Sequence, residues 1–425
     1  MKHPSKETSW HRLDHAATLF PLISNRKYSN VFRIAAQLEE PIDPILLQQA
    51  VNHTLPYFKN FTFRLRRGFF WYYFEPNQRT LMIEEEKSRP CLYIEPHQNH
   101  YLCKVLYFKN RISLEVFHAV TDGMGAMNFL KALVVNYLKL VAGENLGVPE
   151  EVVEVASDTE DSYRKNYRKI PRLGKKFGKA FRVKGKKLPG YTMGIVHGFV
   201  EIEPIKAYCK EKGVTLSMYL AAVYVWSILH AYVQEEGLKK NPIRIGVPVN
   251  LRKFFDSTTT LNFFAHITVS ILVKEEEGSF DHILSQVKEQ FEQQMNKDHF
   301  AGTIADNVKL KSNPIMRIMP LPLKNIIVKQ IYLSIMKSYT GTLSNLGVVQ
   351  MPTRFANQIK NFEFVMNPTA KDPIKCGVVS FEKDLIITIA SQLESTYIQK
   401  EFFRKLAKDG FDVRIESNGA YYENV

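Results

Sequence analysis

Phe117-His118-Ala119-Val120-Thr121-Asp122-Gly123 joins an alternating apolar segment to a long helical pattern, and the rest of the chain is best interpreted outward from it. Side chains of a strand point alternately to its two faces. His118 should therefore share a face with Ile112, Leu114 and Val116. That apolar face is the one we expect to be buried, so the sequence predicts an imidazole at the end of a core strand.

The two ionisable residues of this segment suggest its chemistry. A low dielectric disfavours the imidazolium ion, which would keep His118 neutral and able to act as a general base. Asp122 lies beyond the strand end, where the chain must turn at Gly123 before the helix begins. This position favours Asp122 as a structural brace over a second proton carrier. A buried structural histidine beside an Asp-Gly turn is the alternative interpretation.

The chain is long for a single hydrophobic core. Its 425 residues suggest two domains, and its 45% hydrophobic and 24% charged content is that of an ordinary globular protein. No run of about 18 uncharged apolar residues occurs, so no membrane span is predicted. The N-terminus lacks the apolar core of a signal peptide. Four widely spaced cysteines without a Cys-x-x-Cys pair favour reduced thiols in a cytoplasm.

Strand and helix patterns occur in both halves of the chain, which predicts an α+β (mixed α/β) fold. Helices are expected at residues 45–55 (after an Asp43 N-cap), 127–137, 204–212, 217–232 (with a Ser217 cap), 280–295 and 397–408. Strands are expected at 31–38, 101–107, 112–118, 197–201, 243–247 and 262–273, with a hairpin at 61–74 and two strands joined at 382–384.

A basic segment divides the chain into an N-terminal subdomain (1–160), a connection (161–190) and a C-terminal subdomain (191–425). The net charge is +14, and no acidic residue occurs between Ser162 and Val200. A solvated linker is one interpretation. The other is attraction of an anionic co-substrate or of an anionic membrane surface. Lys175, Lys176 and Lys179 are the candidates to attract the co-substrate. Nucleic acid is disfavoured because the run lacks a binding module and interleaved aromatics.

Several other chemistries lack their sequence patterns. There is no Gly-x-Ser-x-Gly elbow, and no cysteine has the setting of a nucleophile, so a mechanism without a covalent enzyme intermediate is the simpler one. Gly123-Met124-Gly125 lacks the third glycine of a dinucleotide fingerprint. The twelve histidines are scattered without metal-ligand spacing, and no metal is proposed.

The His-x-x-x-Asp-Gly pattern at a strand-to-helix junction resembles the active-site motif of the acyltransferases related to chloramphenicol acetyltransferase. Three more features extend the resemblance toward bacterial alcohol acetyltransferases: the opening segment from Trp10 to Phe20, the segment from Pro248 to Arg252, and Ser344-Asn345-Leu346-Gly347. Many members carry two adjacent histidines, whereas the first position here is Phe117, which places kinship with the condensation-domain branch in doubt. Alternation turns Phe117 to the opposite face, away from His118.

The resemblance implies two domains of a coenzyme A–dependent acyltransferase fold with a tunnel between them, where donor and acceptor meet at His118. His118, Asp122 and Gly123 would form the catalytic motif, and Arg252 would pair with Asp122. Thr342 and Ser344 are the candidates to stabilise the oxyanion, or they serve only a turn before Gly347. Asn345 is a possible substrate contact. Asn262 is either a tunnel-lining residue or, more simply, a strand-end polar residue.

The expected function is therefore transfer of an acyl group, such as acetyl, from acyl-CoA to an alcohol, with acyl-CoA as a co-substrate and no permanently bound cofactor. The acceptor would be a hydroxyl-bearing small molecule or lipid. One alternative is an acyl-carrier-protein-dependent or condensation-type enzyme that acts on a hydroxyl or amine, and another is a non-catalytic binding protein. The apolar and basic stretch 315–336 is either a packed helix or a contact with the inner face of a membrane.

Overall fold

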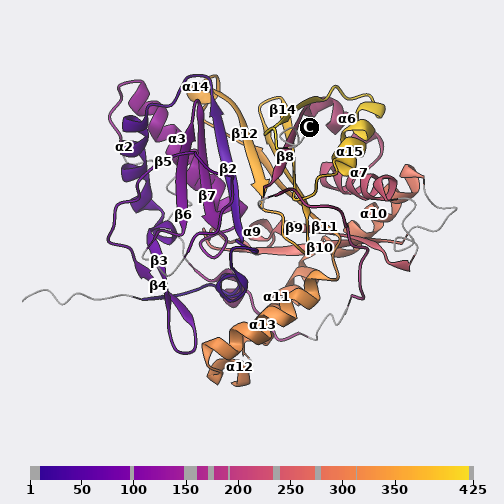
Figure 1. Ribbon diagram of the computed structural model, residues 1–425, viewed down its shortest axis with the longest axis horizontal. Helices are drawn as coiled ribbons and strands as arrows, with labels where there is room; N and C mark the ends of the chain where they lie inside the picture. Colours follow the sequence, from indigo (N-terminus) through magenta and orange to yellow (C-terminus); the bar gives the residue numbers. More distant parts are fainter. Residues whose placement is uncertain are drawn as a thin grey trace, which may run out of the picture.

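The computed structural model describes residues 10–95, 100–147, 160–170, 177–189, 192–232, 240–272, 279–312 and 314–420. They form a mixed α/β, two-domain structure in which two sheets stand next to each other (Figure 1). Each sheet has its own cluster of buried apolar side chains, one built mainly from the N-terminal half and one mainly from the C-terminal half. The expected fold class is confirmed.

The first sheet carries the motif strand at its centre. It contains β2 (Val31–Leu38), β5 (Glu84–Glu85), β6 (Cys103–Phe108), β7 (Arg111–Phe117) and β12 (Ile359–Met366), in the order β12-β2-β7-β6-β5. Helices α2 (Pro44–Thr54) and α3 (Gly123–Val141) cover it on the outside. Asp43 caps α2 by accepting hydrogen bonds from the backbone N–H groups of Ile45 and Leu46, as its position before Pro44 predicted.

The second sheet is larger, with seven strands against five. It contains β8 (Gly194–Glu201), β9 (Ile243–Asn250), β10 (Phe264–Ile271), β11 (Gly341–Val349), β13 (Ile374–Phe381), β14 (Asp384–Ser391) and β15 (Arg414–Ser417), in the order β10-β9-β11-β13-β14-β8-β15. Its outer side is covered by α6 (Ile202–Glu211), α7 (Leu216–Ala231), α10 (Phe280–Gln294) and α15 (Tyr397–Lys408). The cap of α7 is Thr215, not the predicted Ser217, because the helix begins at Leu216.

One strand crosses between the two halves. β12 comes late in the chain, yet it pairs antiparallel with β2 at the edge of the first sheet, so a yellow-orange arrow lies beside an indigo one in Figure 1. The stretch 191–425 therefore supplies a strand to the N-terminal sheet, which a division into contiguous segments did not anticipate. The start of the 161–190 connection forms the short helix α5 (Ser162–Lys165).

A small hairpin sheet and a helical arm lie below the two domains in Figure 1. The hairpin consists of β3 (Phe63–Arg67) and β4 (Tyr72–Pro76), with β1 (His11–Arg12) along β4, which confirms the predicted aromatic hairpin. The arm consists of α11 (Lys297–Ser312), α12 (Pro314–Ile318) and α13 (Leu321–Met336). α13 packs against α1 (Phe20–Ile23), so the arm reaches the segment that precedes the first sheet.

The cysteines and the helix lengths add two facts. All four cysteines are free and buried, and burial raises the pKa of the Cys103 thiol to about 12. Within the described ranges, no single helix is long and apolar enough to cross a membrane, and only the bent pair α6 and α7 reaches that length and composition together.

Candidate active site

His118 lies in the turn that follows β7, at the point where the two sheets come together. Its backbone N–H donates to the carbonyl of Asn30, which holds this turn to the residue before β2. Phe117 is fully buried, whereas the His118 side chain is only partly buried. His118 is thus less enclosed than Phe117.

Asn262 fixes the proton of the imidazole. Its side-chain nitrogen donates to the backbone carbonyl of His118 and to a carboxylate oxygen of Asp14, both at 3.1 Å. Both partners are acceptors only, so the amide oxygen must be the atom that faces His118 Nδ1 at 2.9 Å. An oxygen that accepts there requires a proton on Nδ1. In the neutral ring, the lone pair is then on Nε2.

The surroundings keep the ring neutral. Burial lowers the pKa of His118 below its usual value, while interactions with its own backbone carbonyl, with Asp122 and with Asn262 oppose this change. Phe20 stacks on the ring with a centroid distance of 4.5 Å, and Phe32 meets it edge-on at 5.1 Å. The aromatic walls remove water without supplying a counter-charge, so the proton-free state of Nε2 is favoured.

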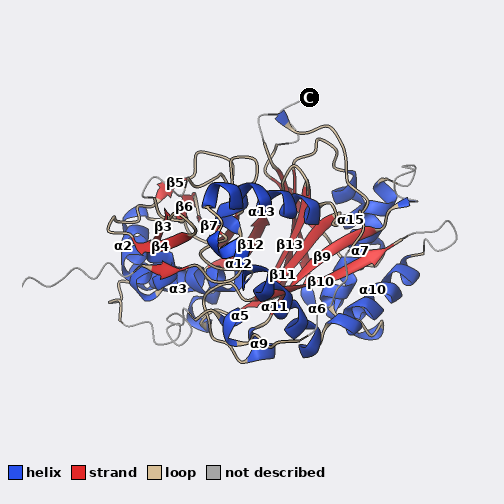
Figure 2. Cartoon of the chain, turned by 90° about the horizontal axis from the view of Figure 1, so that it is seen from below, coloured by secondary structure: helices blue, strands red, loops and turns tan. Residues whose placement is uncertain are grey.

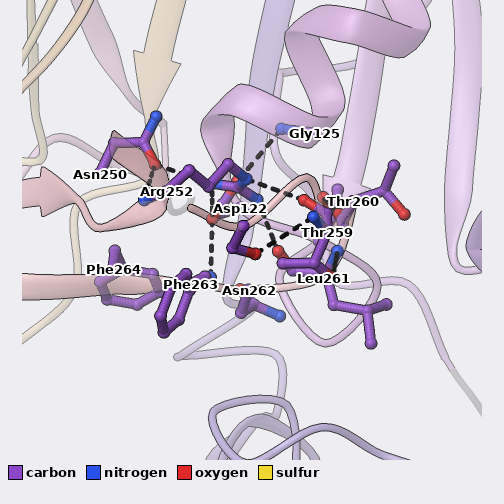
Figure 3. A network of polar contacts seen from close by, with 12 residues as sticks. Asp122, Gly125, Asn250, Arg252, Thr259, Thr260, Leu261, Asn262, Phe263 and Phe264 are labelled. Carbon is purple, nitrogen blue, oxygen red and sulfur yellow. Dashed lines mark hydrogen bonds and ion pairs between the residues drawn. The ribbon is translucent and has the colours of Figure 1, made fainter. Parts of the chain in front are cut away.

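Asp122 forms the predicted ion pair with Arg252. The pair is bidentate, with N–O distances of 2.9 and 3.1 Å, and both side chains are about nine-tenths buried. Figure 3 shows the two groups meeting between the first turn of α3 and the loop that follows β9. Asp122 also accepts from the backbone N–H groups of Gly125 and Phe263. The expected role as a brace, with no proton to transfer, matches this geometry.

The guanidinium of Arg252 is equally well satisfied. It donates to the carbonyls of Thr259 and Leu261 and to the side-chain oxygen of Asn250 (Figure 3). Five donor hydrogens in a planar group thus hold the ends of a single loop and connect them to the motif of the other domain. The loop leads directly into Asn262, so the ion pair and the His118 contact are positioned by one segment.

Two glycines allow this close approach. A Cβ on Gly125 would lie 2.0 Å from the Thr121 hydroxyl oxygen and 2.5 Å from the carbonyl oxygen of Thr260. A Cβ on Gly123 would lie 2.5 Å from a methyl group of Leu346. The first turn of α3 is therefore in contact with both the loop before β10 and the second sheet, at distances that only glycine permits.

The residues proposed to contact the oxyanion or substrate lie on β11 of the second sheet. Thr342 donates its hydroxyl to Asp372 at 3.1 Å, and Ser344 is buried. Asn345 donates to the Ser217 hydroxyl and accepts from the backbone N–H of Gly347. These residues form a strand with a register shift after Asn345, so the simple-turn interpretation does not hold.

The predicted basic residues are only partly described. Lys179 is exposed, while Lys175 and Lys176 lie outside the described residues. No group of three or more His, Cys, Asp or Glu side chains that could hold a metal ion is found in the portion of the chain that the structure describes.

Several contributors to the site were not singled out from the sequence. Asp14 is buried and binds Asn262, and Phe20 covers the imidazole. Asn262 itself had been interpreted more simply as a strand-end residue. Its position after a Thr-rich loop and before an apolar strand is a weak signal, because nothing in the local pattern shows that His118 lies opposite.

No family model and no curated protein matches the sequence. Solved structures do match over nearly the whole chain. TRI3 trichothecene 15-O-acetyltransferase from Fusarium sporotrichioides has 11% identity and a TM-score of 0.63, with 96% of this chain and 95% of that chain covered. TRI101 of the same organism, in complex with coenzyme A and T-2, has 10% identity and a TM-score of 0.63, with 96% and 100% covered.

The first condensation domain of the calcium-dependent antibiotic synthetase, in complex with a substrate analogue, is also similar. It has 13% identity and a TM-score of 0.60, with 96% of this chain and 99% of that chain covered. At these identities the likeness establishes the fold, which is the two-domain fold of the chloramphenicol acetyltransferase-like acyltransferases and condensation domains.

Proposed function

We propose that this protein is an acyltransferase that moves an acyl group, such as acetyl, from acyl-CoA to an alcohol, with His118 as the general base. The observation that carries the proposal is the His118–Asn262 contact, which leaves the lone pair of a neutral imidazole on Nε2. The shared fold supports it, since solved structures of this fold include an acetyltransferase and a complex with coenzyme A.

The reaction needs one proton relay and no covalent enzyme intermediate. Nε2 of His118 removes the hydroxyl proton as the acceptor oxygen attacks the thioester carbonyl. The tetrahedral intermediate then collapses, the C–S bond breaks, and the coenzyme A thiolate takes the proton from the imidazolium. The ester and free coenzyme A leave with His118 neutral again. Asn262 keeps Nδ1 protonated throughout, so one nitrogen serves both transfers.

The oxyanion would be stabilised from β11. Ser344 is our preferred donor, because the Thr342 hydroxyl already binds Asp372 and Asn345 binds Ser217. Asn262 is assigned to orient the base and not to line the substrate path. Gly123 and the Asp122–Arg252 pair are assigned to hold the loop in place.

The predicted tunnel has support from a second histidine. His266 is open to solvent, yet desolvation by surrounding protein, together with the charges of His118 and Lys375, lowers its pKa to about 4. A side chain that is both accessible and closely surrounded is typical of a residue that lines a passage. We place the acyl-transfer centre at the end of this passage, beside His118.

A carrier-bound donor is the second candidate, favoured by the likeness to a synthetase condensation domain and by the basic connection. Lys179 is our candidate to attract either the coenzyme A phosphates or an acidic carrier protein. A cytoplasmic location, together with Lys175 and Lys176 as further attracting residues, stays a prediction.

The test is release of free thiol from acetyl-CoA and longer acyl-CoAs with a panel of alcohols and amines, and from the same acyl groups on a carrier protein. We expect turnover with acyl-CoA and an alcohol. Faster turnover with carrier-bound donor, abolished by Lys179→Glu, would favour the carrier alternative. Binding of donor without any thiol release would show the protein to be non-catalytic.

A further inference from the structure

The helical arm leaves an apolar surface uncovered. α13 is apolar around most of its circumference, yet Leu321 and Lys324 are its only buried residues among its sixteen. A helix of this composition is normally buried. Four of its apolar side chains are exposed instead, and exposed apolar side chains also occur on α12 and at the tip of the β3–β4 hairpin. We call this the arm surface: Phe69, Phe70, Ile315, Ile318, Leu323, Ile326, Ile331 and Ile335.

The hairpin tip and the arm are held together as one unit. The backbone N–H of Leu321 donates to the carbonyl of Phe69, and Nζ of Lys324 donates to the carbonyl of Phe70 at 2.8 Å. Nζ of Lys324 also lies 3.3 Å above the centre of the Trp71 ring. The arm surface is therefore continuous across two segments that are distant in the sequence, and it projects from one side of the molecule in Figure 1.

The two segments that carry the arm surface are basic. Residues 307–362 contain no Asp or Glu, and neither does the hairpin before Glu75, which Arg64 and Arg66 neutralise. In the part of the chain that the structure describes, no ion pair is formed by four basic side chains of the two segments: Arg67, Arg317, Lys329 and Lys337. An apolar surface flanked by cations in both segments complements an anionic bilayer. It opposes a second copy of itself, because like charges would meet.

The arm also leads to the candidate active site. α13 packs against α1, and α1 begins with Phe20, whose ring stacks on His118. In the view from below in Figure 2, α12 and α13 lie in front of the region where the two sheets adjoin. A molecule that leaves a bilayer beneath the arm would meet α1 before it meets the imidazole.

We propose that the arm surface docks the protein onto an anionic lipid bilayer and that the acceptor is an apolar alcohol drawn from that bilayer. The docking stands on the arm surface alone, while the identity of the acceptor rests on the proposed acyl transfer. The apolar side chains enter the headgroup boundary, and the basic residues meet lipid phosphates.

Docking is tested by flotation of the full-length protein with vesicles of phosphatidylcholine alone and of phosphatidylcholine with phosphatidylglycerol. The test variant combines Ile318→Asp and Ile326→Asp. The matched control combines Ile45→Asp and Ile415→Asp, which are exposed isoleucines on α2 and β15. We expect the wild type and the control to float with the anionic vesicles, less with the neutral ones, and the test variant to bind about tenfold or more weakly.

A second variant, Arg317→Gln with Lys337→Gln, keeps every apolar side chain and should reduce binding to anionic vesicles and its dependence on salt. Wild-type protein that floats with neither vesicle, or equal flotation of the wild type and the Ile318/Ile326 variant, would overturn the docking. So would a dimer of the wild type that the Ile318/Ile326 variant dissociates while vesicles leave both unbound.

The acceptor is tested by comparing thiol release with a long-chain alcohol embedded in anionic vesicles and with a short water-soluble alcohol. We expect the Ile318/Ile326 variant to lose about tenfold with the embedded alcohol and to keep its rate with the soluble one. An equal loss for both alcohols would reject the bilayer as the acceptor source. If the wild type releases no thiol with either alcohol, the proposed acyl transfer fails, and the flotation result remains valid on its own.

Discussion

The two ends of the His118–Asp122 segment both contact the second domain, and they do so in opposite ways. Both carboxylate oxygens of Asp122 accept hydrogen bonds from Arg252, and one of them also accepts from Phe263. Arg252 in turn donates to the loop that follows it, for example to the carbonyl of Leu261. Nδ1 of His118 faces Asn262, while Nε2 has no hydrogen-bond partner among the residues that the structure describes. The saturated contact can stabilise but cannot react, whereas the unsaturated contact can accept a proton. The comparison separates the structural part of the motif from the chemical part.

The largest loss of activity is expected from substitution of His118, the end of the segment with a nitrogen left to accept a proton. His118→Ala removes the base and should lower kcat by about 10²–10⁴-fold with little change in thermal stability. Thiol release with acetyl-CoA and an accepted alcohol measures the rate, and a melting curve measures the stability. His230→Ala, which removes an exposed histidine of α7, is the control and should leave both unchanged. Unchanged turnover in His118→Ala would reject the assigned base.

At the Asp122–Arg252 pair, a substitution should lower the stability of the protein as well as its catalytic rate. Arg252→Ala leaves the buried Asp122 carboxylate without its cation, which should lower the free energy of unfolding by about 3–5 kcal/mol. Denaturant unfolding measures this value. Arg354→Ala breaks an exposed pair with Glu144 and should cost about 1 kcal/mol or less. Similar values for the two variants would contradict the bracing role of the Asp122–Arg252 pair.

The link between the two ends is Asn262. Asn262→Ala removes the acceptor that keeps the proton on Nδ1, so kcat should fall by about 10–100-fold while KM changes little. Because the Asn262 hydrogen bond raises the pKa of His118, the acid limb of the rate should also move to lower pH in this variant. A pH–rate profile checks both effects. A variant that raises KM alone would instead make Asn262 a substrate contact.

The smallest expected effect is a shift of the acid side of the pH–rate profile of the wild type. A general base works only when it is neutral, so the rate falls as the pH drops through the pKa of the base. Burial lowers the pKa of His118, and kcat/KM should therefore stay high below pH 6.5, the ordinary histidine value, before it declines. A limb above that value would show that opposing charges outweigh the burial.

Local patterns were sufficient for most of the first domain. Strand 31–38, the Asp43 cap and the aromatic hairpin follow from alternation and capping, which depend on neighbours in sequence. The place of β12 beside β2 could not be found this way, because pairing between strands so far apart leaves no local signal. The same holds for Asp14 and Phe20, whose roles exist only through contacts with Asn262 and His118.

By itself, the sequence determined that an imidazole follows a buried strand, that Asp122 braces the turn before the next helix, and that the chain alternates apolar strands and helices, since these properties depend on neighbours in sequence and on the 2.0 and 3.6 periods of the backbone. The tertiary structure alone decided which nitrogen of His118 carries the proton, because that depends on an amide donated by the other domain. It also decided that the apolar residues 315–336 stay uncovered, since burial depends on what packs against a helix and not on its composition.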